Sequence, residues 1–106
     1  MIKAELFVSA SGELTGFRIT GHSQYAEAGG DIVCAAVSSA AYMAANTITD
    51  VIHADARVVA DDGYMKVSVA EKDARGCRIP LEGLKLHLLG LEEQYPKNID
   101  VTYLEV

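Results

Sequence analysis

Cys34 and His22 are the two residues of this sequence whose types and spacing suit nucleophilic chemistry. Cys34 lies in DIVCAAVSSAAYMAANTI, at the start of a long run of small apolar residues, and His22 precedes it by a short loop. An imidazole beside a thiol can take its proton, and the resulting ion pair is the nucleophile of cysteine hydrolases. A structural role fits the same residue types, because cysteine is among the most buried residues and a lone histidine is usually at the surface. Spacing alone leaves both interpretations open.

Asp31 is predicted to be the N-cap of the helix that carries Cys34. Cys34 then occupies the third helical position, where free backbone N–H groups and the positive helix end favour the thiolate. Those N–H groups could also bind the oxyanion of a tetrahedral intermediate. Asp31 could instead orient His22 as the third member of a triad. A carboxylate this close to the thiol raises the pKa of the thiol, whereas the positive helix end lowers it. The sequence leaves open which effect is larger.

Ser38 and Tyr25 are the other candidates for the site. Ser38 follows Cys34 by one helical turn on the same face, so it could hydrogen-bond within the site or serve only as a small residue for close packing. Tyr25 lies in the loop that leads to Gly29 and Gly30. These glycines could let the loop move over a substrate, or only permit the turn into the helix.

The remaining cysteine and histidines offer weaker chemistry. Cys77 lies in a polar segment without a neighbouring histidine or catalytic acid and is expected to be a bystander, while His53 and His87 are expected to be structural. Metal sites need ligands in close pattern, such as paired cysteines or two histidines one turn apart, and the sequence has none. We therefore expect neither a metal nor another cofactor.

The elements that must position these residues follow from hydrophobic periodicity and turn signals. Strands are predicted over residues 2–9, 14–20, 56–62, 64–70 and 99–103, and helices over residues 31–53 and 80–95. The polar segment 71–77 is predicted to be a loop. The order ββαββαβ indicates an α+β fold with the helices packed on one face of a mixed or antiparallel sheet. Residues 1–106 are expected to form a single domain.

Composition narrows the class of partner and the compartment. The formal net charge is −6, and no basic cluster of the kind that binds nucleic acid is present, so we expect no direct nucleic-acid partner. An acidic surface suits a basic partner better. The N-terminus does not read as a secretory signal, and Ser38, Ser39 and Asn46 interrupt the apolar helix, so we expect no membrane span. A cytoplasmic location with reduced thiols follows as an expectation, which disfavours a disulfide.

The stretch from Gly21 to the alanine-rich helix closely resembles the ribosomal-processing cysteine proteases of bacteria, a family first catalogued as a domain of unknown function. The resemblance lies in GH at 21–22, a short loop with Tyr25 and Ala26, then Gly30 and DIVCAAVSS. It extends over nearly the whole chain, including the DGY turn at 62–64 and the closing pattern GL…L…YP…I.

The resemblance implies a small cytoplasmic endopeptidase that works as a homodimer. Members of the family remove the N-terminal extension from the precursor of the large-subunit ribosomal protein bL27, cutting after a paired-Phe motif. Carried over, Cys34 is the nucleophile, His22 the base and Asp31 an assisting acid. Gly21 matches the glycine before the base, and Ser38 a position near the site.

Two rival functions use the same residues differently. A non-catalytic, ribosome-associated binding module would hold a basic peptide on the acidic surface, and Cys34 would then be a packing residue that reacts only on unfolding. A redox-sensing thiol would oxidise reversibly without cutting any peptide.

Overall fold

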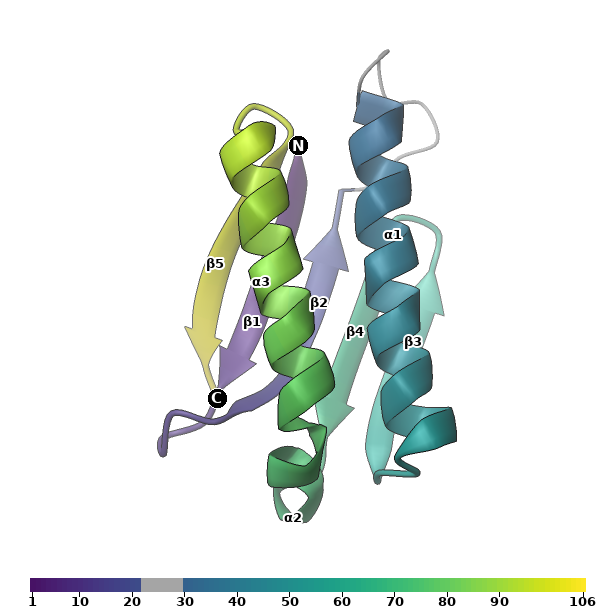
Figure 1. Ribbon diagram of the computed structural model, residues 1–106, viewed down its shortest axis with the longest axis vertical. Helices are drawn as coiled ribbons and strands as arrows, with labels where there is room; N and C mark the ends of the chain where they lie inside the picture. The colour runs from purple at the N-terminus through teal and green to yellow at the C-terminus, as the bar shows by residue number, and fades with distance from the viewer. Residues whose placement is uncertain (22–29) are drawn as a thin grey trace.

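Five strands form one mixed sheet, and two long helices lie across one of its faces (Figure 1). The structure is a computed structural model that describes residues 1–21 and 30–106, apart from the side chains of residues 30 and 31. The strands are β1 (Ile2–Val8), β2 (Leu14–Thr20), β3 (Ala56–Asp61), β4 (Tyr64–Val69) and β5 (Ile99–Glu105). The helical elements are α1 (Gly30–Asn46), a π-helical turn (Thr47–Val51), α2 (Glu71–Ala74), a 3₁₀ turn (Arg75–Cys77) and α3 (Arg78–Gln94).

The strand order across the sheet is β3-β4-β2-β1-β5. β1 pairs with β2, β2 with β4, and β3 with β4, all antiparallel, whereas β5 joins β1 in parallel. A parallel neighbour needs a crossover, and α3 provides it between the last antiparallel strand and β5. The predicted α+β class, the element order and the placement of both long helices on one face are confirmed.

One side of α1 forms the centre of the core. Val33 and Val37 are fully buried and Ala41 and Ala44 lie almost as deep, while Ile48 in the π-helical turn that follows α1 is also fully buried. By length and composition alone, the stretch from Ile32 to Val51 is long and apolar enough to cross a membrane. In this fold one side of the stretch is buried in the core, whereas Ile32, Met43 and Val51 are exposed.

The segment predicted as a loop over residues 71–77 is helical instead. It forms α2 and the 3₁₀ turn, and α3 continues directly from it at Arg78, two residues before the predicted start at Pro80. The reason is tertiary: Ala74 and Cys77 are buried against the core, and this packing outweighs a polar local sequence. Pro80 still fits, because proline is tolerated in the first helical turn, where N–H groups have no helical partner.

On the open face of the sheet, two basic side chains lie over the ring of Phe7. The Arg18 guanidinium lies 6.0 Å and the Lys66 ammonium 5.8 Å from the centre of the Phe7 ring, which is only 4% exposed. Arg18 also donates a 2.8 Å hydrogen bond to the Glu5 carboxylate, and this bond lowers the pKa of Glu5. These long side chains cover the apolar ring while their charges stay in water.

Two glycines give opposite expectations for stability. A Cβ at Gly16 would meet the backbone carbonyl oxygen of Val67 and would lie 3.2 Å from the Phe7 ring, whereas one at Gly90 in α3 meets nothing. We therefore expect Gly16→Ala to lower the free energy of unfolding by about 2–3 kcal/mol. Gly90→Ala should raise it by about 1 kcal/mol, because alanine favours helix. Urea unfolding followed by circular dichroism measures both, and a Gly16→Ala variant as stable as the wild type contradicts this packing.

Candidate active site

β2 ends and α1 begins toward the same end of the molecule (Figure 1), so Gly21 after β2 and Cys34 near the start of α1 lie toward that end. The Gly21 N–H donates a 3.3 Å hydrogen bond to the carbonyl of Gly63, in the turn between β3 and β4. The chain thus leaves the sheet beside that turn before it reaches residue 22, and it is described again from Gly30. A segment distant in sequence, the turn between β3 and β4, therefore fixes the backbone at Gly21.

Gly21 occupies a position that only glycine fills without strain. Its φ is +83°, and a Cβ there would lie 2.5 Å from the carbonyl oxygen of Met1. Left-handed backbone of this kind costs other residues about 1–2 kcal/mol, and the close carbonyl adds a clash. Gly21 thus sets the direction in which the chain enters the candidate site, a physical reason for the glycine in the GH pair.

α1 starts two residues before Ile32, the first helical residue expected after the predicted N-cap Asp31. The helix begins at Gly30, so Asp31 is a residue of the first turn and not the N-cap, and Cys34 is the fifth helical residue instead of the third. The amide of Cys34 therefore lies in the hydrogen-bonded part of the helix, and the free N–H groups belong to residues before it. Helical side chains lean toward the N-terminus, so the thiol is still directed at that turn.

Cys34 and Ser38 share one flank of α1. Both side chains are partly buried, and Cys34 packs against the edge of the hydrophobic core. One helical turn separates the two residues, so the Ser38 hydroxyl lies one turn below the thiol on the same side of the helix. The thiol is thus held by packing yet accessible to solvent, as a nucleophile requires.

Three predicted site residues have no described side chain. His22 and Tyr25 lie outside the described residues, as does the side chain of Asp31. Their roles as base, loop residue and assisting acid therefore stay predictions. Among the described residues, no group of three or more histidine, cysteine and acidic side chains could hold a metal ion.

Cys77 belongs to the core and not to a polar loop. Its side chain is fully buried, and burial raises the pKa of the thiol, with the nearby Asp73 carboxylate adding to the effect. Both changes make the thiol a poor nucleophile. Cys34 and Cys77 are both free cysteines.

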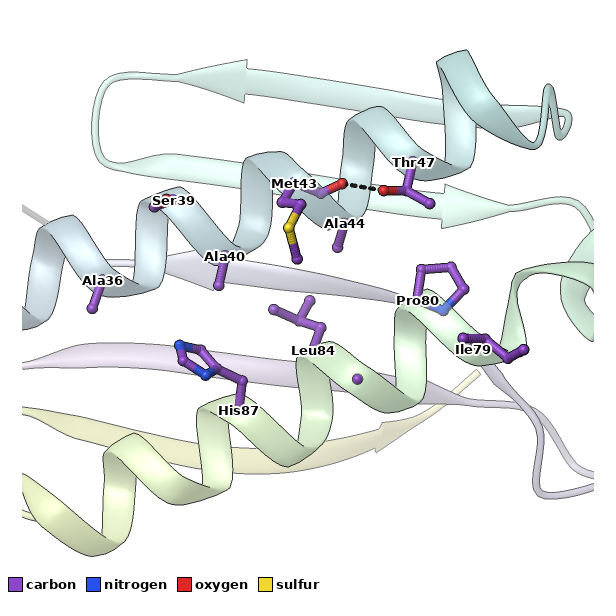
Figure 2. A pocket seen from close by; sticks show the side chains of 11 residues that line it. Ala36, Ser39, Ala40, Met43, Ala44, Thr47, Ile79, Pro80, Leu84 and His87 are labelled. Atoms are coloured by element: carbon purple, nitrogen blue, oxygen red, sulfur yellow. Dashed lines mark hydrogen bonds between the residues drawn. The ribbon is translucent and has the colours of Figure 1, made fainter.

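Sequence reasoning missed an apolar groove of about 680 Å³ between α1 and α3 (Figure 2). Its walls come from one flank of each helix, and the His87 ring points into it from α3. The lining residues are Ala36, Ser39, Ala40, Met43, Ala44, Thr47, Ile79, Pro80, Gly83, Leu84 and His87. Small residues on both helices were the available signal, since they leave space between helices that large side chains would fill.

Comparison with known proteins identifies the family. The model of the family described as cysteine protease Prp matches residues 1–100. This chain belongs to that family. It is therefore a cysteine protease.

Two relatives match this chain over nearly their full length. The ribosomal processing cysteine protease Prp of Staphylococcus aureus is 27% identical over 105 residues, which cover 97% of this chain and 99% of the relative. Its counterpart in Bacillus subtilis is 30% identical over 108 residues, with 96% of both chains covered.

Solved structures of the family share the fold. A crystal structure of the essential ribosomal processing protease Prp of S. aureus in complex with a substrate peptide superposes with a TM-score of 0.89 and 25% identity, covering 98% of this chain and 100% of that one. A second S. aureus structure, with a covalently linked product peptide, gives a TM-score of 0.85 at 26% identity and the same coverage.

The two cysteines should differ clearly in their rates of alkylation. Iodoacetamide should modify Cys34 in the native protein, because its side chain is partly exposed, and should leave Cys77 untouched until the protein unfolds, because burial both shields that thiol and raises its pKa. Mass spectrometry of native and urea-treated protein measures this, with Cys34→Ala as the control that takes up no native label. Native labelling of both thiols at similar rates contradicts the described burial of Cys77.

Proposed function

We propose that this protein removes the N-terminal extension of the bL27 precursor and thereby supports ribosome assembly. The observation that carries the proposal is the full-length structural match to an S. aureus Prp in complex with a substrate peptide. The formal net charge of −6 adds support, because an acidic enzyme attracts a basic ribosomal protein. We place the reaction in the cytoplasm, where a catalytic thiol stays reduced.

In the proposed mechanism, Cys34 is the nucleophile and His22 is the base. The thiolate attacks the scissile carbonyl carbon, and free N–H groups in the first turn of α1 stabilise the oxyanion. His22 then protonates the leaving amine, which leaves a thioester on Cys34. Water attacks the thioester, releases the new carboxyl end and restores the thiol. Asp31 is the proposed assisting acid, and Gly21, Tyr25 and Ser38 are the proposed supporting residues.

A mass spectrum of the extended bL27 precursor after incubation with this protein tests both the reaction and the substrate. We expect a single cut after the paired-Phe motif, and no cut with Cys34→Ala, because the variant keeps a small side chain at the position but has no nucleophile. Complete cleavage by Cys34→Ala would falsify the proposed chemistry. An intact precursor together with a thiol that alkylates readily would remove the proposed substrate and keep the nucleophile.

We also propose that the protein works as a homodimer. Large apolar side chains beside the groove between α1 and α3 are strongly exposed, with Met43 at 70%, Ile79 at 78% and Leu86 at 75%. Exposed apolar surface next to a groove is typical of protein–protein contacts. A second copy of the chain would cover these side chains.

Sedimentation velocity tests the dimer. We expect Leu86→Glu to shift the protein toward the monomer, because a charge in an apolar contact is costly to bury. Leu104→Glu, the same change on the open face of the sheet, is the control and should sediment like the wild type. A wild-type protein that is monomeric at micromolar concentration contradicts the proposal, and an unchanged Leu86→Glu variant moves the contact elsewhere.

A further inference from the structure

The three sides of α1 have different surroundings. One side, with Val33 and Val37, is buried on the sheet, and a second, with Ala36 and Ala40, lines the groove that faces α3 (Figure 2). At 3.6 residues per turn, Cys34 falls on the third side, opposite the groove. The candidate nucleophile is therefore turned away from α3.

β3 is the strand on that side of the molecule. It is one edge of the sheet, with β4 as its neighbour, and α1 stands over β4 and β3 while α3 packs against β2 and β5 (Figure 1). The turn that follows β3 contains Gly63, whose carbonyl accepts the hydrogen bond from Gly21. The Ala60 end of β3 thus adjoins the end of the molecule where β2 leaves the sheet and α1 begins.

The register shows which backbone groups of β3 point outward. The Ala70 N–H donates a 2.8 Å hydrogen bond to the Asp55 carbonyl, and these two residues continue the ladder that pairs Ala56 with Val69. Hydrogen-bonded and non-bonded pairs alternate in an antiparallel ladder. Ala56, Val58 and Ala60 therefore direct their N–H and C=O groups away from β4.

This edge has little of the usual protection against further pairing, because Arg57 and Asp61 are the only charged residues of β3. In residues 1–21 and 30–106, no strand pairs with the outer side of β3, and five of its six residues are exposed. The register shows no bulge, and the strand contains neither proline nor lysine. Bulges, prolines and lysines are features that commonly prevent another strand from pairing with an edge. The opposite edge is partly capped, because the Glu92 carboxylate accepts a 2.6 Å hydrogen bond from the outward N–H of Val101 in β5.

We propose that the free edge of β3 binds the polypeptide substrate as an added strand and so carries its backbone past the Cys34 flank of α1. The chain is a protease of a family that includes a structure with a peptide substrate, and extended peptides are recognised by strand addition at open sheet edges. Six residues of strand span about 20 Å, enough to hold several peptide residues. Exposed Asp61 and Asp62, at the end of β3 nearest the site, suit a basic peptide.

The experiment removes one edge donor without touching the ladder. Ala60→Pro deletes an outward N–H, which an edge strand tolerates because β4 does not use it. Glu105→Pro is the matched control: the Val106 N–H bonds inward to Val8, so the N–H of Glu105 points outward from the far edge. The probe is a synthetic peptide that spans the N-terminal extension and paired-Phe motif of the host's bL27, with cleavage followed by mass spectrometry.

We expect Ala60→Pro to lower kcat/KM about tenfold, mainly through KM, the effect of losing one hydrogen bond. Glu105→Pro should match the wild type. A peptide that is N-methylated at the amide pairing with β3 should show a similar loss of kcat/KM with the wild type. With Ala60→Pro the additional loss of kcat/KM should be small, because both changes remove contacts along the same edge. Iodoacetamide labelling of Cys34 should be unchanged in both variants, which shows that the site is folded.

The proposal rests on the proposed protease function, and the outcomes separate the two. If the wild type cuts the peptide and Ala60→Pro cuts it with unchanged KM, the edge proposal is wrong and the proposed function stands. If the wild type leaves the peptide intact, the proposed function fails and the edge proposal fails with it. If Ala60→Pro sediments as a monomer while the wild type is a dimer, the edge binds a second copy of the chain and not the substrate. If Ala60→Pro also loses native labelling of Cys34, the same comparison is made with Val58→Pro, at the next outward donor.

Discussion

The burial of one side of α1 against the sheet is the constraint on which the rest of the structure depends. Val33, Val37 and Ala41 are buried in the core, and their helical spacing fixes the rotation of α1 about its own axis. Once that rotation is set, every other position of the helix has a defined direction. Ala41 and Ala44 extend the same buried side along the helix.

That rotation gives the two exposed flanks of α1 different roles. One flank faces α3 across an apolar groove, with large exposed side chains at its rim, and this is the face on which we place a second copy of the chain. The other flank carries Cys34 and Ser38 above the β3 edge. A single helix thus separates the surface proposed for assembly from the surface proposed for catalysis, so a partner on one flank leaves the other open to a peptide.

The fold holds the candidate nucleophile, the Cys34 thiol, at the edge of the hydrophobic core. Cys34 packs against the margin of the core, where neighbouring side chains fix its direction while part of it reaches solvent. Cys77 shows the contrast, because full burial raises the pKa of its thiol and shields it. Gly21 adds a second constraint from a distant segment: its left-handed backbone passes close to the carbonyl of Met1, at the start of β1. Burial and backbone geometry, more than residue type, therefore separate a candidate nucleophile from an inert cysteine.

The sequence by itself determined the element order, the α+β class, the family and the presence of Cys34 and Ser38 on one side of a helix. These features depend on local periodicity and on a short motif, both of which can be read along the chain. Only the tertiary structure decided that residues 71–77 are helical, that Cys77 is buried, that a groove separates α1 from α3 and that β3 is an open edge beside the Cys34 flank. Each of these depends on contacts between segments far apart in sequence, such as the parallel pairing of β5 with β1 or the docking of the β3–β4 hairpin on β2. Local sequence does not determine which element will pack against a given face of a helix or strand, because burial is a property of the folded chain.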